Sequence, residues 1–166
     1  MSYPFSIAAL SLEGGGRIGV CALPGLFGDP ASDLAAIIAW RPDIVVSMTE
    51  QSEMDEVGMG NFGAPLAVAG IEWRRLPIRD FSGPEGTAKE AWPALATHLH
   101  AILDRGGAVL LHCRGGRGRS GMIALRLLVE RGEEAEAALA RLRTERPGAV
   151  ETSGQFTWAS QGRRRA

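Results

Sequence analysis

The chain has 166 residues, 45% of them hydrophobic, and a formal net charge of -1 at pH 7. This length and apolar content suit one compact core, so we predict a single domain over residues 1–166 with a short flexible tail from about residue 161. The nearly neutral balance lacks the basic excess of dedicated nucleic-acid binders and of polybasic membrane binders. We therefore expect no nucleic-acid partner, and we expect any anionic partner to be bound locally.

The cysteines and the apolar runs indicate a cytoplasmic protein. Cys21 and Cys113 are the two cysteines, too few for a disulfide-stapled fold and without metal-ligand spacing. The first four residues lack the basic charge that begins a secretory leader, and no apolar run reaches the roughly 18 residues of a membrane span. We expect no stable membrane insertion, and we interpret Cys21 as a small core side chain.

Apolar runs alternate with helical patterns along the chain. Runs rich in β-branched residues, bounded by Gly, Pro, Asp or Arg, predict strands, and apolar spacing of three to four residues predicts helices. In chain order, the predicted elements are strands 5–11 and 18–23, helix 32–40, strand 43–48, helix 62–70, strand 72–78, helix 87–104, strand 108–113 and helices 119–131, 133–146 and 151–160. Strands that alternate with helices predict an α/β fold with a largely parallel central sheet.

Three residues set expected helix boundaries. Ser32 is a candidate N-cap for the first helix, and Thr87 opens the pattern over 87–104. Pro93 lies inside that pattern, and proline removes an interior hydrogen bond. We therefore expect the helix either to kink at Pro93 or to begin later.

The buried strand pattern over 108–113 runs into a glycine-rich loop and then into an apolar helical pattern. Gly115, Gly116 and Gly118 let the backbone curl without Cβ clashes, so that successive N–H groups can point inward as an anion nest. The following helix adds the positive end of its dipole. The candidate phosphate-binding residues are Arg114, Gly115, Gly116, Arg117, Gly118 and Arg119.

Cys113 stands at the mouth of this loop, where N–H donors, the helix dipole and Arg119 would all stabilise a thiolate. The thiolate is the nucleophilic form of cysteine. Arg119 follows six residues later and would return beside the sulfur, where its guanidinium could hold two oxygens of a phosphoryl group. We predict Cys113 as nucleophile and Arg119 as phosphate clamp.

The motif His112-Cys113-x5-Arg119-Ser120-Gly121 resembles the signature of the protein tyrosine and dual-specificity phosphatase superfamily. Outside it, segments 18–25, 76–80 and 146–152 resemble blocks of the kinase-associated (cyclin-dependent kinase inhibitor) phosphatases. The resemblance implies a twisted, mainly parallel sheet flanked by helices. It also implies phosphomonoester hydrolysis through a cysteinyl-phosphate intermediate, without a metal or other cofactor.

Further site residues follow from the chemistry and the resemblance together. The leaving oxygen needs a proton, and Asp80 occupies a position that resembles the family's general acid, although an aspartate before a Gly-Pro loop is also a common turn former. Ser120 could donate a hydrogen bond to the sulfur, cap the helix, or do both. The resemblance gives His112 a role in orienting the loop. Gln155 is a candidate for positioning the hydrolytic water, and equally a plain helix-surface residue.

We weighed three functions. The first is a dual-specificity protein phosphatase, which acts on phosphotyrosine, phosphoserine or phosphothreonine of a phosphorylated protein. The second is a phosphoinositide or inositol polyphosphate phosphatase, because Arg114 and Arg117 place two extra positive charges in the loop, a pattern also seen in tensin-related lipid phosphatases. The third is a non-catalytic phosphate-binding module, which the joint presence of Cys113, Arg119 and Asp80 disfavours. For all three functions, we expect the loop to bind phosphate-like anions.

Overall fold

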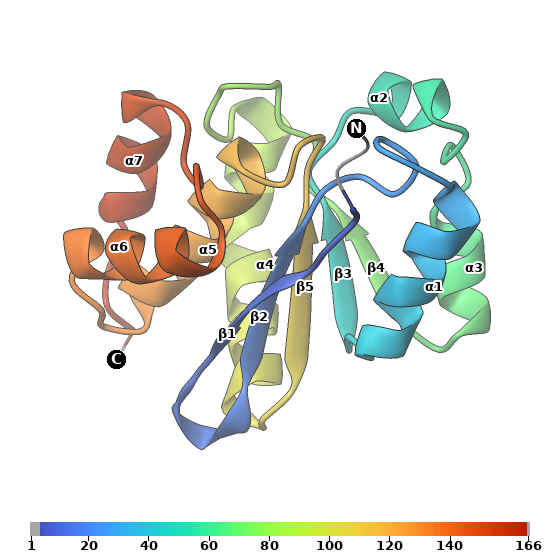
Figure 1. Cartoon of the computed structure of the whole chain (residues 1–166). Coiled ribbons are helices and arrows are strands. Elements are labelled where there is room, and N and C mark those ends of the chain that lie inside the picture. The colour runs from blue at the N-terminus through green and yellow to red at the C-terminus, as the bar shows by residue number, and fades with distance from the viewer. Residues whose placement is uncertain (1–3, 166) are drawn as a thin grey trace.

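The computed structural model describes residues 4–165. The expectation that no secretory leader is present rests on the first four residues, of which residues 1–3 lie outside the described part, as does Ala166. The described residues form a five-stranded sheet in the order β1-β2-β5-β3-β4 (Figure 1). Only β1 is antiparallel to its neighbour, and the other pairs are parallel. The strands are β1 (Ala8–Ser11), β2 (Arg17–Cys21), β3 (Ile44–Ser47), β4 (Glu72–Arg75) and β5 (Ala108–His112). The predicted α/β fold with a mainly parallel sheet is confirmed.

Helices cover both faces of the sheet (Figure 1). One hydrophobic cluster joins α1 and α3 to Val45 and Leu110, and the other joins α4 and α5 to Val46 and Leu111. Adjacent strand residues enter opposite clusters because side chains alternate across a strand. The helices are α1 (Pro30–Trp40), α2 (Gln51–Glu56), α3 (Gly63–Val68), α4 (Gly86–Asp104), α5 (Gly118–Glu130), α6 (Ala135–Glu145) and α7 (Ser153–Ser160).

The sheet brings three connecting segments to one edge. Because β3, β4 and β5 run parallel, the segments that follow them leave at the same end of the sheet. The glycine-rich loop follows β5, helix α2 follows β3, and the segment that contains Asp80 follows β4. Residues far apart in the sequence therefore meet at the carboxyl edge of the strands.

The predicted start of the first helix was wrong, and the later start considered for the helix over 87–104 is excluded. Helix α1 begins at Pro30, and its N-cap is Asp29, whose carboxylate accepts a hydrogen bond from the N–H of Ser32 at 3.0 Å. Proline suits the first helical position because the N–H it lacks would have no helical partner there. Helix α4 begins at Gly86 and continues through Pro93. Its long buried face against the sheet outweighs the lost interior hydrogen bond.

The sequence interpretation missed a short element at the functional edge. Helix α2 spans six residues, less than two turns, so it cannot show a helical period in the sequence. A capping box between Glu50 and Glu53 closes its first turn. A three-residue 3-10 helix over Glu13–Gly15 was missed for the same reason.

Beyond α7, the last described residues lie against the body of the fold. The guanidinium of Arg165 donates to both carboxylate oxygens of Asp104, at 3.2 and 2.7 Å. The single-domain organisation with a tail from about residue 161 stays a prediction. Over residues 4–165, we find no helix with the length and apolar character that crossing a membrane requires.

Candidate active site

The loop after β5 closes tightly against the neighbouring strand β2. Gly116 adopts a left-handed φ of 70°, which favours glycine. A Cβ at this position would lie 2.5 Å from the carbonyl carbon of Cys21 and 2.6 Å from the backbone nitrogen of Ala22. Only glycine fits here, so the predicted need for loop glycines has a specific steric cause at Gly116.

Cys113 lies at the centre of this loop, directly after β5. Its residue surface is only 2% exposed, and its Sγ lies 3.2 Å from the Oγ of Ser120 on the first turn of α5. The serine hydroxyl can donate a hydrogen bond to the sulfur and stabilise negative charge there. The structure therefore brings together two of the residues that the sequence interpretation selected.

The loop amides around this sulfur have no internal partners. The N–H groups of residues 114–119 donate no hydrogen bond to any group among residues 4–165. On the outer side, the carbonyls of Gly115 and Gly116 accept hydrogen bonds from Arg146, at 3.1 and 2.9 Å. Because a peptide unit is planar, a carbonyl turned outward sends the following N–H to the opposite side. The loop thus presents unpaired donors, as an anion site requires.

Arg119 is fully buried beside Cys113 and is held by a carboxylate. Its Nη1 and Nη2 donate to the two oxygens of Glu53 at 2.8 and 2.7 Å, and Nη1 also donates to the carbonyl of Ile78 at 3.0 Å. Its Nε is buried and finds no partner within the described residues. A buried N–H without a partner is costly, so this donor points to a ligand group that the site is built to hold.

Glu53, on α2, is a site residue that the sequence interpretation missed. Burial alone would raise the pKa of its carboxyl, but hydrogen bonds from Arg119 and from the N–H of Glu50 outweigh burial and hold the pKa below its usual 4.5. Burial likewise would lower the pKa of Arg119, and the Glu53 carboxylate raises it. The pair stays charged at neutral pH. The available signal was an acidic cluster directly after a strand that ends at the carboxyl edge of the sheet.

Asp80 lies beside Arg119, in the segment that follows β4. Its Oδ1 is 3.3 Å from Nη2 of Arg119 and accepts a hydrogen bond from the N–H of Phe81 at 3.0 Å. The Asp80 side chain is 39% exposed, so it can reach a bound substrate and solvent. Phe81 adopts a left-handed φ of 63°, unusual for a large side chain, and it is 59% exposed. The geometry brings the predicted acid within reach of the predicted phosphate clamp.

Gln155 is completely buried at the N-terminus of α7, rather than on a helix surface. Its Oε1 accepts hydrogen bonds from the N–H groups of Glu151 and Thr152, at 2.9 and 3.2 Å. Its Nε2 donates to the carbonyl of Ser82 at 3.4 Å, in the segment that carries Asp80. The plain surface alternative is therefore wrong. Gln155 thus links the segment that contains Asp80 to helix α7. Its role in positioning the hydrolytic water stays a prediction.

His112 is fixed as a neutral imidazole by a chain of hydrogen bonds. Trp73 Nε1 donates to Ser47 Oγ at 2.8 Å, Ser47 Oγ lies 2.5 Å from His112 Nε2, and His112 Nδ1 lies 3.1 Å from the carbonyl of Cys113. Burial lowers the pKa of His112 to about 4, so at neutral pH the ring carries one proton. Because a carbonyl only accepts, that proton belongs on Nδ1, and the Ser47 hydroxyl donates to Nε2. His112 thereby orients the carbonyl of Cys113, the predicted nucleophile.

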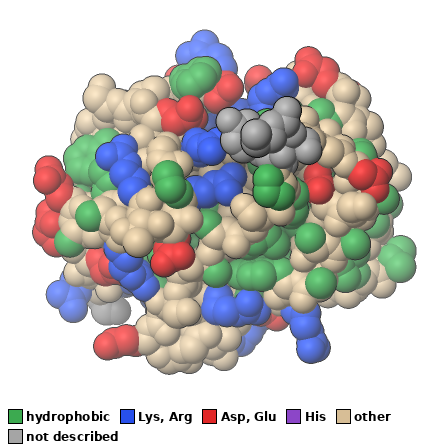
Figure 2. All heavy atoms as spheres, in the orientation of Figure 1, with side chains coloured by type: hydrophobic (Ala, Val, Ile, Leu, Met, Phe, Trp, Pro, Cys, Tyr) green, Lys and Arg blue, Asp and Glu red, His purple; other side chains and the backbone are tan. Residues whose placement is uncertain are grey.

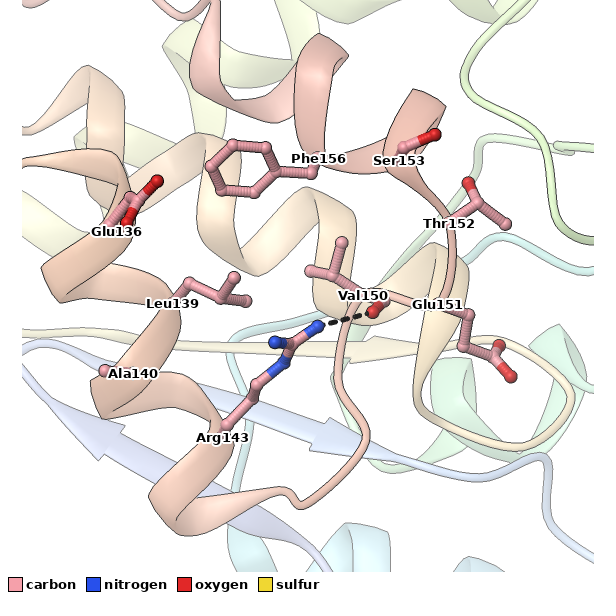
Figure 3. A pocket seen from close by; sticks show the side chains of 9 residues that line it. All are labelled: Glu136, Leu139, Ala140, Arg143, Val150, Glu151, Thr152, Ser153 and Phe156. Carbon is pink, nitrogen blue, oxygen red and sulfur yellow. Dashed lines mark hydrogen bonds between the residues drawn. The ribbon is translucent and has the colours of Figure 1, made fainter.

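The segment before α7 braces the loop from behind. Arg143 on α6 donates to the carbonyls of Ala149 and Val150 at 2.8 and 2.9 Å, and Figure 3 shows the bond to Val150. The N–H of Val150 donates to the carbonyl of Arg117 at 3.1 Å. Together with the two bonds from Arg146 to the loop carbonyls, these contacts hold the loop in its curled form. The sequence interpretation did not identify Arg143 or Arg146.

The two extra arginines of the loop diverge to opposite flanks. Arg114 forms an ion pair with Glu56 of α2 at 3.2 Å, and both side chains are substantially exposed. Arg117 donates through Nε to the carbonyl of Pro147 at 3.2 Å, on the side of the α6–α7 connection.

Cys21 is fully buried, and burial raises the pKa of its thiol far above the usual value. Its interpretation as a core side chain agrees with this environment.

A buried cysteine in a nest of free amides, followed by a buried arginine and faced by an aspartate, defines the class of cysteine-dependent phosphatases. Among the described residues, no group of three or more His, Cys, Asp or Glu side chains is arranged to hold a metal ion. A family model described as "Polymorphic toxin system, DSP-PTPase phosphatase" matches residues 33–133, more than half of the chain. The chain belongs to this family of dual-specificity and protein tyrosine phosphatases.

Known relatives agree with this assignment. The chain is 33% identical over 100 residues to protein tyrosine phosphatase type IVA 3 of Bos taurus, an alignment that covers 60% of this chain and 57% of that protein. The chain therefore matches little more than half the length of this curated relative.

Solved structures share the fold over almost the whole chain. A kinase-associated phosphatase with serine in place of its catalytic-site cysteine aligns with a TM-score of 0.82 and 24% identity, over 96% of this chain and 94% of that one. PTPMT1 in complex with PI(5)P aligns with a TM-score of 0.72 and 16% identity, over 93% of both chains. At these identities, the two likenesses establish the fold.

Proposed function

We propose that this protein hydrolyses phosphate monoesters through a cysteinyl-phosphate intermediate. The observation that carries the proposal is the buried, unpartnered Nε of Arg119 beside the free N–H groups of residues 114–119. We infer that these donors surround the space beside Cys113 Sγ, where a phosphate dianion would accept their hydrogen bonds. Donors fixed before the substrate arrives stabilise the charge of a transferring phosphoryl group without reorganising.

In the first step, the Cys113 thiolate attacks phosphorus, an S–P bond forms, and the bond to the leaving oxygen breaks. Asp80 donates its proton to that oxygen, which leaves as an alcohol or phenol. Arg119 and the loop N–H groups bind the equatorial oxygens of the phosphoryl group.

In the second step, water attacks the phosphocysteine, the S–P bond breaks and Asp80 takes the proton from water. Ser120, at 3.2 Å from Sγ, donates a hydrogen bond to the departing thiolate. We keep Gln155 as a candidate for positioning the water through its effect on the acid segment. No step uses a metal or an organic cofactor.

We propose a phosphorylated protein as the substrate, with activity toward phosphotyrosine and toward phosphoserine or phosphothreonine. Membership of the dual-specificity and tyrosine phosphatase family and the type IVA relative support this class. We also propose a cytoplasmic location, which the two free thiols support.

A phosphoinositide or inositol polyphosphate is the second candidate. Two observations favour it: Arg114 and Arg117 add charge to the loop, and the structurally similar PTPMT1 was crystallised with PI(5)P. Initial rates measured side by side on a phosphotyrosine peptide, a phosphothreonine peptide and soluble inositol phosphates will rank the candidates. A higher kcat/KM on an inositol phosphate than on either peptide would reverse our order.

The nucleophile is tested with Cys113→Ser. We expect this variant to lose turnover of p-nitrophenyl phosphate and to keep phosphate binding, because the amide nest and Arg119 remain. Phosphate release and isothermal titration measure the two properties separately. Turnover that survives the substitution would disprove the role of Cys113.

The acid is tested with Asp80→Asn on two leaving groups. A nitrophenolate leaves readily without a proton, whereas an alkoxide does not, so we expect kcat to fall much more on an alkyl phosphate than on p-nitrophenyl phosphate. The ratio of the two losses is the measurement. Equal losses on both substrates would exclude Asp80 as the general acid.

A further inference from the structure

A cavity adjoins the outer flank of the glycine-rich loop. It has a volume of about 430 Å³, and Phe5, Ser6, Ala22, Arg117 and Arg146 are among the residues that line it. No acidic side chain belongs to its described lining. In Figure 2, Lys and Arg side chains gather near the middle of the face where the β5–α5 loop lies, with hydrophobic side chains beside them. The cavity therefore combines positive charge with an apolar wall.

The two arginines of this cavity keep unused donors. Arg117 donates through Nε to Pro147, and Arg146 donates through Nε and Nη2 to the loop carbonyls. Neither guanidinium forms an ion pair with a carboxylate among residues 4–165, and both Nη atoms of Arg117 and Nη1 of Arg146 donate to no described group. Several N–H donors thus stay available on two side chains that line one cavity.

The positive charges of Arg117 and Arg146 also repel each other. Burial, and then the nearby charge of Arg117, lower the pKa of Arg146 from its usual value. Arg146 cannot turn away, because its bonds to Gly115 and Gly116 fix it behind the loop. An anion between the two guanidiniums would relieve this repulsion and receive hydrogen bonds from both forks.

We propose that this cavity is a second anion-binding site, outside the cup formed by Cys113 and Arg119, which takes an oxyanion carried on an apolar body. Phosphate, phosphonate and carboxylate groups have the required charge and acceptors for the arginine forks. Phe5 and Ala22 supply the apolar wall for the attached group. The inference goes beyond the proposed hydrolysis, since it needs neither the nucleophile nor the acid.

Two sources could supply the anion. It can be a second anionic group on the molecule whose phosphate occupies the catalytic loop, or it can belong to a separate ligand. The loop arginine Arg117 lines the cavity, so the two sites adjoin, and one extended substrate could occupy both. The recognised chemistry is the same for both sources.

The test uses the full chain with Cys113→Ser, titrated with phenylphosphonate and followed by backbone amide NMR and calorimetry. We expect two equivalents of phenylphosphonate to bind. One should change the amide chemical shifts of loop 114–119, and the other should change those of Ser6 and Ala22. A single equivalent that shifts only the loop would overturn the proposal.

A charge variant and its neutral match identify the second site. Ser6 is exposed at the rim of the cavity, so Ser6→Glu places a carboxylate beside the arginines, and Ser6→Gln adds similar bulk without charge. We expect Ser6→Glu to weaken the second equivalent about tenfold and Ser6→Gln to leave it within about twofold. Similar affinities for the two variants, with native amide spectra for both, would also overturn the proposal.

A bisphosphonate distinguishes the two sources. With p-xylylene bisphosphonate, one-to-one binding that shifts both sets of amides supports an anion carried on the same molecule as the first. Two independent equivalents support a separate ligand. Shifts confined to the loop contradict a second site of either kind.

Discussion

Replacing Glu53 with glutamine tests whether the Glu53–Arg119 pair builds the phosphate clamp. The two carboxylate oxygens accept from Arg119 at 2.8 and 2.7 Å, and the guanidinium is fully buried while Glu53 is 13% exposed. In Glu53→Gln, one oxygen still accepts, but an amide NH2 faces the other guanidinium nitrogen, so one charge-assisted hydrogen bond is lost. Such a bond contributes about 1.5–3 kcal/mol, and an unpaired buried charge adds to the cost.

We therefore expect a total loss of about 2–3 kcal/mol, which corresponds to about 30- to 150-fold at roughly 1.4 kcal/mol per factor of ten. One part of this loss will appear as a lower free energy of unfolding, because Glu53 compensates the buried charge of Arg119. The other part will appear as slower catalysis, because Glu53 holds Arg119 in place. Urea unfolding measures the first part. The value of kcat/KM on p-nitrophenyl phosphate measures the second, and we expect it to fall at least about tenfold.

Glu56→Gln on the same helix is the matched control. Glu56 pairs with Arg114, but their side chains are 63% and 41% exposed, so this surface pair is worth at most about 1 kcal/mol. Should Glu53→Gln keep its kcat/KM within twofold and its unfolding free energy within about 0.5 kcal/mol, as the control is expected to do, the reasoning about the clamp is refuted.

The same pair predicts a dependence on pH. Because the pKa of Glu53 lies below its usual 4.5 in the folded protein, its contribution to stability is fully present above pH 4.5. It is lost as the pH falls through the folded value. The difference in unfolding free energy between the wild type and Glu53→Gln should therefore shrink below pH 4.5, and a difference that stays constant would contradict the assigned charge.

The remaining predictions concern the loop and its histidine. Gly116→Ala should lower the unfolding free energy by at least about 1 kcal/mol, because its Cβ meets the backbone of Cys21 and Ala22 and its φ is left-handed. Gly115→Ala has no atom within 4 Å of its Cβ, so equal losses in urea unfolding would count against this explanation. His112 has a folded pKa of about 4 against its usual 6.5, so stability is expected to fall by about 3 kcal/mol as the pH drops across that window. His112→Asn should remove this decrease in stability between pH 6.5 and pH 4. If the free energy of unfolding of the variant depends on pH as that of the wild type does, the assignment of a buried neutral ring is contradicted.

The strands and the loop were predictable because their signals are local. The run over 108–111 is apolar on both faces of β5, and the glycines that follow allow the tight curl that Gly116 adopts. Cys113 and Arg119, the proposed nucleophile and phosphate clamp, belong to the same short segment, six residues apart. Sequence reasoning found Asp80 only with the help of a resemblance, because the turn-forming role of aspartate gives the same local pattern.

The late start considered for helix α4 failed because long-range packing competes with local preference there. Pro93 should disturb an isolated helix, but α4 buries a long face that includes Trp92 and Leu99 against the sheet. Helix α2 escaped notice because six residues are too few to display a period. Its identity as a helix matters because it carries Glu53.

By itself, the sequence determined the class of fold and the position of the glycine-rich loop, and it led to the roles that we propose for Cys113 and Arg119, since each depends on neighbours within a few residues. Only the tertiary structure decided what holds these groups in place. Glu53 lies 66 residues before Arg119, and Ser47 lies 65 residues before His112. The pairing of such distant side chains is set by the order of parallel strands, which brings their carboxyl ends to one edge, and no local pattern encodes that order.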